Sequence, residues 1–213
     1  MESNKAYVFD FDGTLVDSMD KAVSVVLNYL TKRGVEYPPG IVRTLIPLGF
    51  SGIAKYYHQH FGLVEPPEQI LADFKEELAY IYATEMDAKV GAQTTLSALK
   101  ARGARLFMLT GSPHLFLDKC LTRLGLDKYF EQCWTTEDLG MSKGDTAIYK
   151  EVAKRIGLPI ENCIMVDDGV KALKKAHEAG MQTIGFYDSY SADNEQEMRS
   201  FADKYVYCFN QLI

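Results

Sequence analysis

Four short segments of the sequence carry side chains that could act together on a phosphate group. They are Asp10-Phe11-Asp12-Gly13-Thr14, Thr110-Gly111-Ser112, the single residue Lys143, and Asp167-Asp168-Gly169. Each follows a short apolar run, directly or, for Lys143, after a loop. Any one of them alone is more typical of a turn or a solvated surface. Together they supply carboxylates, a hydroxyl group and a lysine, which are the groups that metal-assisted phosphoryl transfer needs.

The elements that must position these groups follow from the hydrophobic pattern. Short apolar, β-branched or aromatic runs that end in polar residues or glycine predict strands at 6–11, 105–109, 132–135, 163–166 and 182–186, with an edge strand at 205–209. Helical patterns, each closely followed by a glycine, occur at 94–102, 115–124, 146–156 and 170–178. This alternation predicts a Rossmann-like α/β core, a parallel sheet covered on both faces, whose ligands bind beyond the carboxyl ends of the strands.

Residues 16–89 break the alternation, because they show helical periodicity and no convincing strand. Ala22, Val25, Val26 and Tyr29 belong to one apolar stripe, and prolines punctuate the segment. A helical insertion directly after the first strand fits this pattern best. We therefore expect a discontinuous core domain of residues 1–15 and 90–213 and a small α-helical domain of residues 16–89.

Composition and charge narrow the class of protein. The 213 residues are 47% hydrophobic and 24% charged, as in an ordinary globular protein, and the net charge of −6 argues against a nucleic-acid or anionic-membrane surface. No apolar leader and no apolar run of transmembrane length is evident, so we expect a cytoplasmic protein with no membrane partner. The four cysteines are widely spaced, which favours reduced thiols over a disulfide frame or a zinc site.

The segment from Val8 to Ser18, with the sequence VFDFDGTLVDS, closely resembles the first motif of the haloacid dehalogenase-like hydrolase superfamily. Thr110 resembles the second motif of that family, Lys143 the third, and Asp167-Asp168 the fourth. The resemblance covers the core almost end to end. The helical insertion is similar in position to the small caps, of the C1 type, in the phosphoglycolate phosphatase and β-phosphoglucomutase branches.

The resemblance implies a role for each carboxylate. Asp10 would be the nucleophile that forms an aspartyl-phosphate, and Asp12 would protonate the leaving oxygen and then deprotonate the attacking water. Mg²⁺, which prefers oxygen ligands, would be held by Asp10, by Asp12 through its backbone carbonyl, and by Asp168. Asp167 would be a further ligand or an outer-shell group.

The remaining motif residues would bind the phosphoryl group. Thr110 would donate a hydrogen bond to it, backbone N–H groups near Gly111 would contribute, and Lys143 would hold its negative charge. Asp12 also narrows the chemistry, since the dehalogenase and phosphonate-cleaving branches lack an acid at this position. The expected substrates are therefore phosphate esters of small metabolites.

Two motifs depart from the family pattern. Lys143 is followed by Gly144-Asp145-Thr146 where the family usually has a Pro-x-Pro pattern, which suggests a more mobile loop. Downstream of Asp167-Asp168, a second acid is missing at Ala172. The adjacent acidic pair is slightly more similar to the β-phosphoglucomutase version of the motif.

Substrate selection is expected from the helical insertion. The loop at 48–52, which contains Phe50 and Ser51, is the candidate, with Arg43 and Lys55 near it. Plain helix packing explains these residues about as well. The preferred function is a Mg²⁺-dependent phosphatase that acts as a monomer or weak dimer. A β-phosphoglucomutase-type mutase and a catalytically silent binding protein are the alternatives.

Overall fold

The computed structural model describes residues 4–213; residues 1–3, part of the expected core segment 1–15, lie outside the described part. The chain divides into two compact units. One consists of Met1–Ser18 and Asp87–Ile213, and the other of Met19–Met86. The four motifs singled out in the sequence all belong to the first unit, which is referred to below as the core unit.

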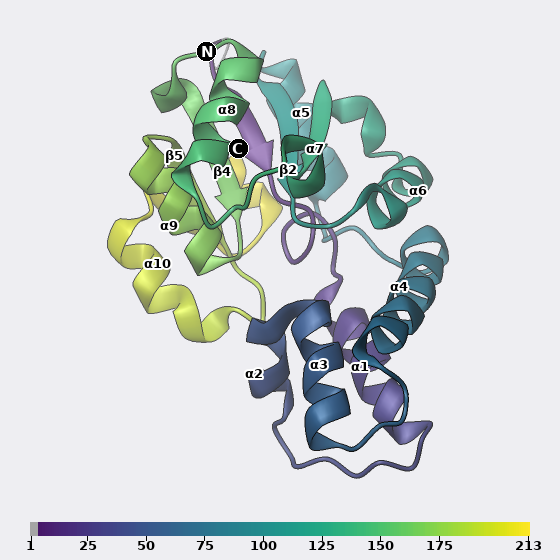
Figure 1. The fold of residues 1–213 in the computed structure, drawn as a ribbon. Coiled ribbons are helices and arrows are strands. Elements are labelled where there is room, and N and C mark those ends of the chain that lie inside the picture. The colour runs from purple at the N-terminus through teal and green to yellow at the C-terminus, as the bar shows by residue number, and fades with distance from the viewer. Residues whose placement is uncertain (1–3) are drawn as a thin grey trace. The chain divides into compact units, whose positions relative to one another are not determined.

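The core unit contains one six-stranded sheet with the strand order β3-β2-β1-β4-β5-β6 (Figure 1). All neighbouring strands are parallel. The strands are β1 (Ala6–Phe9), β2 (Arg105–Thr110), β3 (Gln132–Thr135), β4 (Cys163–Asp167), β5 (Gln182–Phe186) and β6 (Lys204–Val206). The predicted Rossmann-like parallel α/β sheet is therefore confirmed.

Helices cover both faces of this sheet, as the buried strands require. The helices of the core unit are α5 (Ala92–Ala101), α6 (His114–Leu124), α7 (Thr136–Leu139), α8 (Thr146–Ile156), α9 (Val170–Ala179) and α10 (Glu195–Phe201). In Figure 1, α8 and α9 lie on one side of the strands and α5 and α6 on the other. Glycines with positive φ end α6, α8 and α9, at Gly125, Gly157 and Gly180.

Successive side chains of β1 point to opposite faces of the sheet. Val8 belongs to the cluster that β1 shares with α8 and α9, which includes Val152 and Leu173. Phe9 faces the other way, with its ring centroid 6.3 Å from Phe130 and 6.4 Å from Phe209. The central strand is thus buried on both faces of the sheet.

The second unit is entirely helical. It consists of α1 (Met19–Thr31), α2 (Val42–Leu45), a 3-10 helix (Ile46–Leu48), α3 (Gly49–His60) and α4 (Pro67–Thr84). Its core is aromatic: Phe74 lies against Tyr29 and Tyr57 at centroid distances of 5.0 and 5.9 Å. The buried Tyr57 hydroxyl donates a hydrogen bond to the backbone carbonyl of Val26 at 2.9 Å.

Three local predictions were wrong. The expected loop at 48–52 is helical: the 3-10 helix ends at Leu48 and α3 begins at Gly49, whose φ of +61° lets the chain turn from one helix into the next. The edge strand stops at Val206, and Phe209 instead lies in a 3-10 helix, where it is buried against Phe186. The first strand, expected at 6–11, ends at Phe9, before the motif that begins at Asp10. Among residues 4–213, no helix combines the length and the hydropathy that a membrane span requires.

Candidate active site

The parallel register of the sheet brings the first and fourth motifs together. Phe9 pairs with Val166 across β1 and β4, and the next backbone N–H, that of Asp10, donates to the carbonyl of Val166 at 2.9 Å. Asp10 and Asp167 therefore lie next to each other at the carboxyl ends of two neighbouring strands. This is the carboxyl edge of the sheet, where open α/β folds bind ligands.

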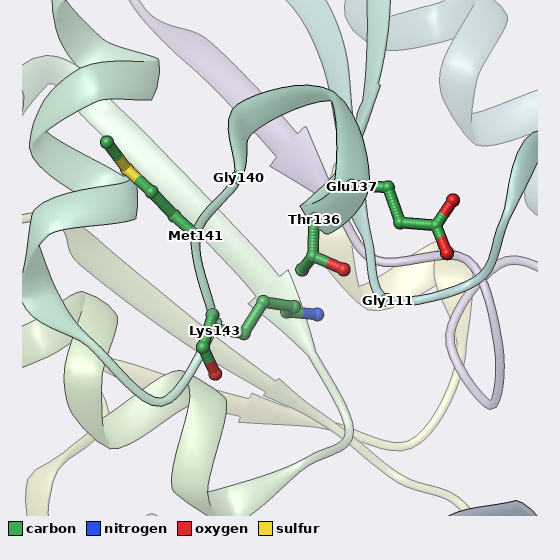
Figure 2. Close-up of a pocket in the computed structure, with 7 residues that line it drawn as sticks. Gly111, Thr136, Glu137, Gly140, Met141 and Lys143 are labelled. Atoms are coloured by element: carbon green, nitrogen blue, oxygen red, sulfur yellow. The ribbon is translucent and has the colours of Figure 1, made fainter. Parts of the chain in front are cut away.

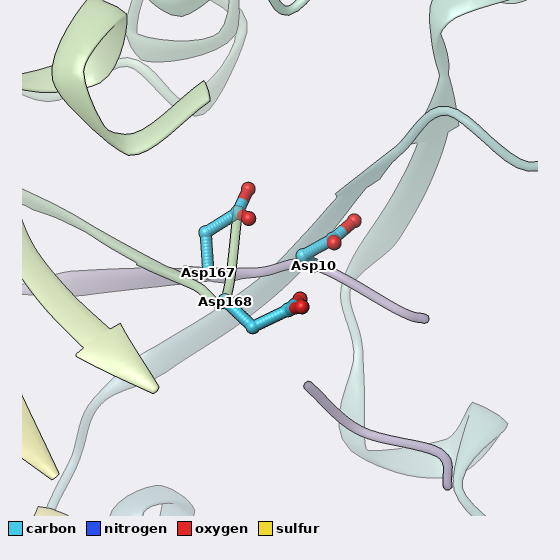
Figure 3. A group of neighbouring side chains, drawn as sticks. All are labelled: Asp10, Asp167 and Asp168. Atoms are coloured by element: carbon cyan, nitrogen blue, oxygen red, sulfur yellow. The ribbon is translucent and has the colours of Figure 1, made fainter. Parts of the chain in front are cut away.

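Three carboxylates converge at this edge (Figure 3). Asp10, Asp167 and Asp168 each place a carboxylate oxygen within 4.8 Å of the others. Asp10 and Asp167 are buried, with 8% and 1% of their surfaces exposed. Three negative charges this close together repel strongly unless cations neutralise them.

Lys143 supplies one of those cations. Its Nζ lies 2.9 Å from Oδ1 of Asp10 and 2.6 Å from Oδ2 of Asp167. Asp167 Oδ2 makes no directional hydrogen bond, so the ammonium group is its partner. Burial by itself would lower the pKa of Lys143, but the two aspartates outweigh burial and raise the pKa well above its usual range. Lys143 is thus a permanent cation.

One lysine does not neutralise three carboxylates, and the pKa values of Asp10 and Asp168 are accordingly raised. Burial raises the pKa of Asp10 to about 7; Lys143 opposes the shift and Asp167 adds to it. Burial, followed by repulsion from Asp167 and Asp10, raises the pKa of Asp168 well above its usual value. A buried, oxygen-only cluster with surplus negative charge fits a hard divalent cation.

The loop that carries Lys143 is fixed although it lacks the prolines of the family pattern. The buried Tyr149 hydroxyl lies 2.8 Å from the backbone carbonyls of both Lys143 and Ala172, so it ties this loop to α9. Asp145 caps the first turn of α8 by accepting from the N–H of Ala147 at 2.9 Å. The N–H of Asp145 donates to the carbonyl of Ser142 at 3.0 Å. The side chain of Lys143 therefore starts from a well-defined backbone position.

Asp12 lies outside the carboxylate cluster and has a different partner. Ser112, from the loop after β2, donates its hydroxyl hydrogen to Oδ2 of Asp12. The backbone N–H of Ser112 donates to Oγ1 of Thr110 at 2.9 Å. Because the Thr110 oxygen accepts this bond, its own hydroxyl hydrogen is left to donate to a ligand.

Gly13 is required by the close approach of Asp168. Gly13 has φ of +71°, and a Cβ atom at this position would lie 2.5 Å from Oδ2 of Asp168. Thr14 forms hydrogen bonds with the same residue, Asp168. Its hydroxyl donates to Oδ1 of Asp168 at 3.1 Å and accepts from the N–H of Asp168 at 3.1 Å.

These groups line an open cavity of about 340 Å³. Its lining combines the predicted residues with three others: Asp10, Asp12, Thr110, Gly111, Ser112, Lys143, Asp167, Asp168, Gly169 and Ala172. Sequence reasoning assigned no role to Ser112, Thr14 or Tyr149. For Ser112 and Thr14 the available signal was a hydroxyl side chain within two residues of a motif residue, whereas Tyr149 carried no local signal.

The predicted substrate-selecting residues belong to the helical unit. Arg43 lies on α2, and Phe50, Ser51 and Lys55 lie on α3. Phe50 packs against Phe74 with a centroid distance of 6.4 Å, and the other three are exposed. Their role in substrate selection stays a prediction.

The chain resembles known proteins in sequence and in fold. Residues 4–180 match the family model of haloacid dehalogenase-like hydrolases. A phosphoglycolate phosphatase from Psychrobacter arcticus is 28% identical over 204 residues, covering 90% of this chain and 86% of that protein. A 6-phosphogluconate phosphatase from Escherichia coli K12 is 26% identical over 192 residues, covering 87% and 84%. The crystal structure of CbbY from Rhodobacter sphaeroides with phosphate has a TM-score of 0.80 at 20% identity, covering 98% of this chain and 96% of that one. This last likeness concerns the fold alone.

Proposed function

Since the chain belongs to the haloacid dehalogenase-like hydrolases, we propose that its core cavity hydrolyses phosphate monoesters of small metabolites through an aspartyl-phosphate on Asp10. The family match and the phosphatases among its relatives make the protein a phosphoric monoester hydrolase. The observation that carries the finer proposal is the placement of Asp10. It is a buried carboxylate at a strand end, paired with Lys143 and adjacent to Asp168.

The first step transfers the phosphoryl group to the protein. A carboxylate oxygen of Asp10 attacks phosphorus, and the bond between phosphorus and the ester oxygen breaks. Asp12 gives its proton to the departing oxygen, so that the product leaves as an alcohol. Lys143 and the Thr110 hydroxyl hold the negative charge of the transferring group.

The second step returns Asp10 to its starting state. Asp12, now a carboxylate, takes a proton from a water molecule, which attacks phosphorus. The bond between phosphorus and Asp10 breaks, and inorganic phosphate leaves. Ser112, which contacts Asp12, and Tyr149, which fixes the Lys143 loop, orient these groups without taking part in bond making.

The cluster fits a divalent cation, and Mg²⁺ is the proposed ion. Asp10, Asp168 and the backbone carbonyl of Asp12 would hold it. Asp167 is already ion-paired with Lys143 and accepts a hydrogen bond from the N–H of Gly169 at 2.7 Å, which favours an outer position for it. When bound, the ion supplies positive charge to the cluster and to the phosphoryl oxygens.

Residues 16–89 would form the cap domain of this enzyme, of the C1 type. Within it, Arg43, Phe50, Ser51 and Lys55 are the proposed substrate-selecting residues. Three of them are exposed polar side chains on α2 and α3.

A phosphate-release screen over small phosphoesters with Mg²⁺, run beside Asp10→Asn, tests the proposal. Wild type should release phosphate in multiple turnovers, and Asp10→Asn should not. Asp127→Asn is the matched control, because Asp127 is an exposed aspartate that precedes β3 and so lies toward the opposite edge of the sheet. Equal release by wild type and Asp10→Asn would refute the nucleophile assignment. Sugar phosphate isomerisation without phosphate release would instead identify a mutase.

A further inference from the structure

A second hollow of about 530 Å³ adjoins the catalytic cavity (Figure 2). Gly111 and Lys143 line both spaces. The remaining wall includes Thr136 and Glu137 from α7 and Met141 and Ser142 from the loop after it. A phosphoryl group held by Lys143 and the Gly111 loop would therefore lie next to this hollow, and a group attached to it could extend inside.

The wall formed by α7 is held in place by several hydrogen bonds. Thr135 and Asp138 form a capping box, with N···O distances of 2.8 and 3.1 Å between each backbone N–H and the other side chain. His114 Nε2, from the start of α6, lies 2.9 Å from Oδ2 of Asp138. The N–H of Met141 donates to the carbonyl of Thr136 at 3.1 Å. The hollow is thus a preformed feature of the core unit.

The polar side chains that line the hollow are the hydroxyls of Thr136 and Ser142, the carboxylate of Glu137 and the ammonium of Lys143. Within residues 4–213, the exposed Glu137 carboxylate makes no hydrogen bond or ion pair. Figure 2 shows its side chain extending toward the Gly111 loop, whereas that of Met141 points to the opposite side. The one cation of the lining, Lys143, is already paired with Asp10 and Asp167.

We infer that this hollow receives the leaving group of the substrate and favours one that donates hydrogen bonds and carries no negative charge. A hydroxyl or an ammonium group can donate to Glu137 and to the oxygen atoms of Thr136 and Ser142. A second carboxylate or phosphate would meet the charge of Glu137 with no unpaired cation in the lining. This inference rests on the proposed phosphatase activity and narrows its substrate class.

Three two-carbon phosphate esters that differ only at the far end test the inference. They are 2-hydroxyethyl phosphate, phosphoethanolamine and phosphoglycolate, which end in a hydroxyl, an ammonium and a carboxylate. In wild type, kcat/KM should be higher for the first two than for phosphoglycolate. Glu137→Gln should raise the relative kcat/KM of phosphoglycolate by about two- to fivefold, as expected for a partly screened charge pair. Glu137→Lys should raise it further.

Glu161→Gln is the matched control, since Glu161 is an exposed glutamate that immediately precedes β4, at the far edge of the sheet. It should leave the ratios unchanged. Ratios unaltered in Glu137→Gln and Glu137→Lys would overturn the inference while leaving phosphatase activity intact. If no ester is turned over, the proposed phosphatase activity is refuted, but the inference about the hollow can still be tested. Calorimetry then measures how tightly each of the three esters binds to the Asp10→Asn variant and to the double variant that carries both Asp10→Asn and Glu137→Gln. Equal binding ratios in these two variants would also overturn it.

Discussion

The hydroxyl of Ser112 donates a hydrogen bond to the carboxylate of Asp12, although the two residues are 100 positions apart in the chain. The backbone N–H of the same serine donates to the hydroxyl oxygen of Thr110. One turn after β2 therefore contacts both the proposed acid–base residue and the proposed phosphate-binding hydroxyl. This arrangement indicates that Ser112 is a positioning residue for Asp12.

Ser112→Ala should lower kcat more than it changes KM, by about 10- to 100-fold on alkyl phosphates, because a hydrogen bond to a charged group is lost. The loss should be smaller on p-nitrophenyl phosphate, whose leaving group needs no proton. Steady-state kinetics on both substrates measure the difference. Asp12→Ala should show the same selectivity with a larger loss, and Ser112→Thr should restore activity. An equal loss on both substrates would indicate that Ser112 acts only on folding or phosphate binding.

Asp10→Asn should stabilise the protein in the presence of a chelator, increasingly so as the pH rises. The pKa of Asp10 in the folded state is about 7, above the ordinary value of 3.8, so the folded state binds more protons between these values. Wild type therefore loses stability as pH rises through this window, and the variant lacks this loss. The advantage of Asp10→Asn in unfolding free energy should grow by on the order of 2 kcal/mol between pH 5 and pH 8.

Denaturant unfolding at several pH values measures this trend, with Asp127→Asn as the control for an exposed aspartate. Saturating Mg²⁺ should reduce the trend, because a bound cation favours the ionised carboxylates. A pH-independent difference between wild type and Asp10→Asn would contradict the raised pKa.

Gly13→Ala should lower both stability and Mg²⁺ affinity. The substitution forces a non-glycine residue to a φ of +71° and places Cβ 2.5 Å from the Asp168 carboxylate. Gly34→Ala is the matched control, because Gly34 has a φ of +67° with no atom within 4 Å of an added Cβ. Both variants should lose about 1–2 kcal/mol through backbone strain. Only Gly13→Ala should also weaken metal binding in a titration; equal metal affinity in both variants would argue that Asp168 is not a ligand.

The strands and helices of the core were largely predictable because their signals are local. Apolar runs and the glycines that follow the helices predicted both ends of β2, β3, β4, α6, α8 and α9 to within one residue. The shorter elements α7 and α10 were not predicted, since a helix of four to seven residues has too few turns to show a period. Gly49 was expected in a loop, yet helix α3 begins there. Its φ of +61° and ψ of 170° lie outside the helical region, so this glycine turns the chain from the preceding 3-10 helix into α3.

By itself, the sequence determined the chemical groups and their place beyond the ends of strands, because each motif is short and follows a buried strand directly or, for Lys143, after a loop. Tertiary structure alone decided how those groups act on one another. Ser112 reaches Asp12, Thr14 holds Asp168 from 154 positions away, and Tyr149 ties the Lys143 loop to α9. The physical reason is that the parallel sheet brings the ends of β1, β2 and β4 to one edge. Hydrogen-bond geometry and burial there depend on atoms from segments that no local pattern relates.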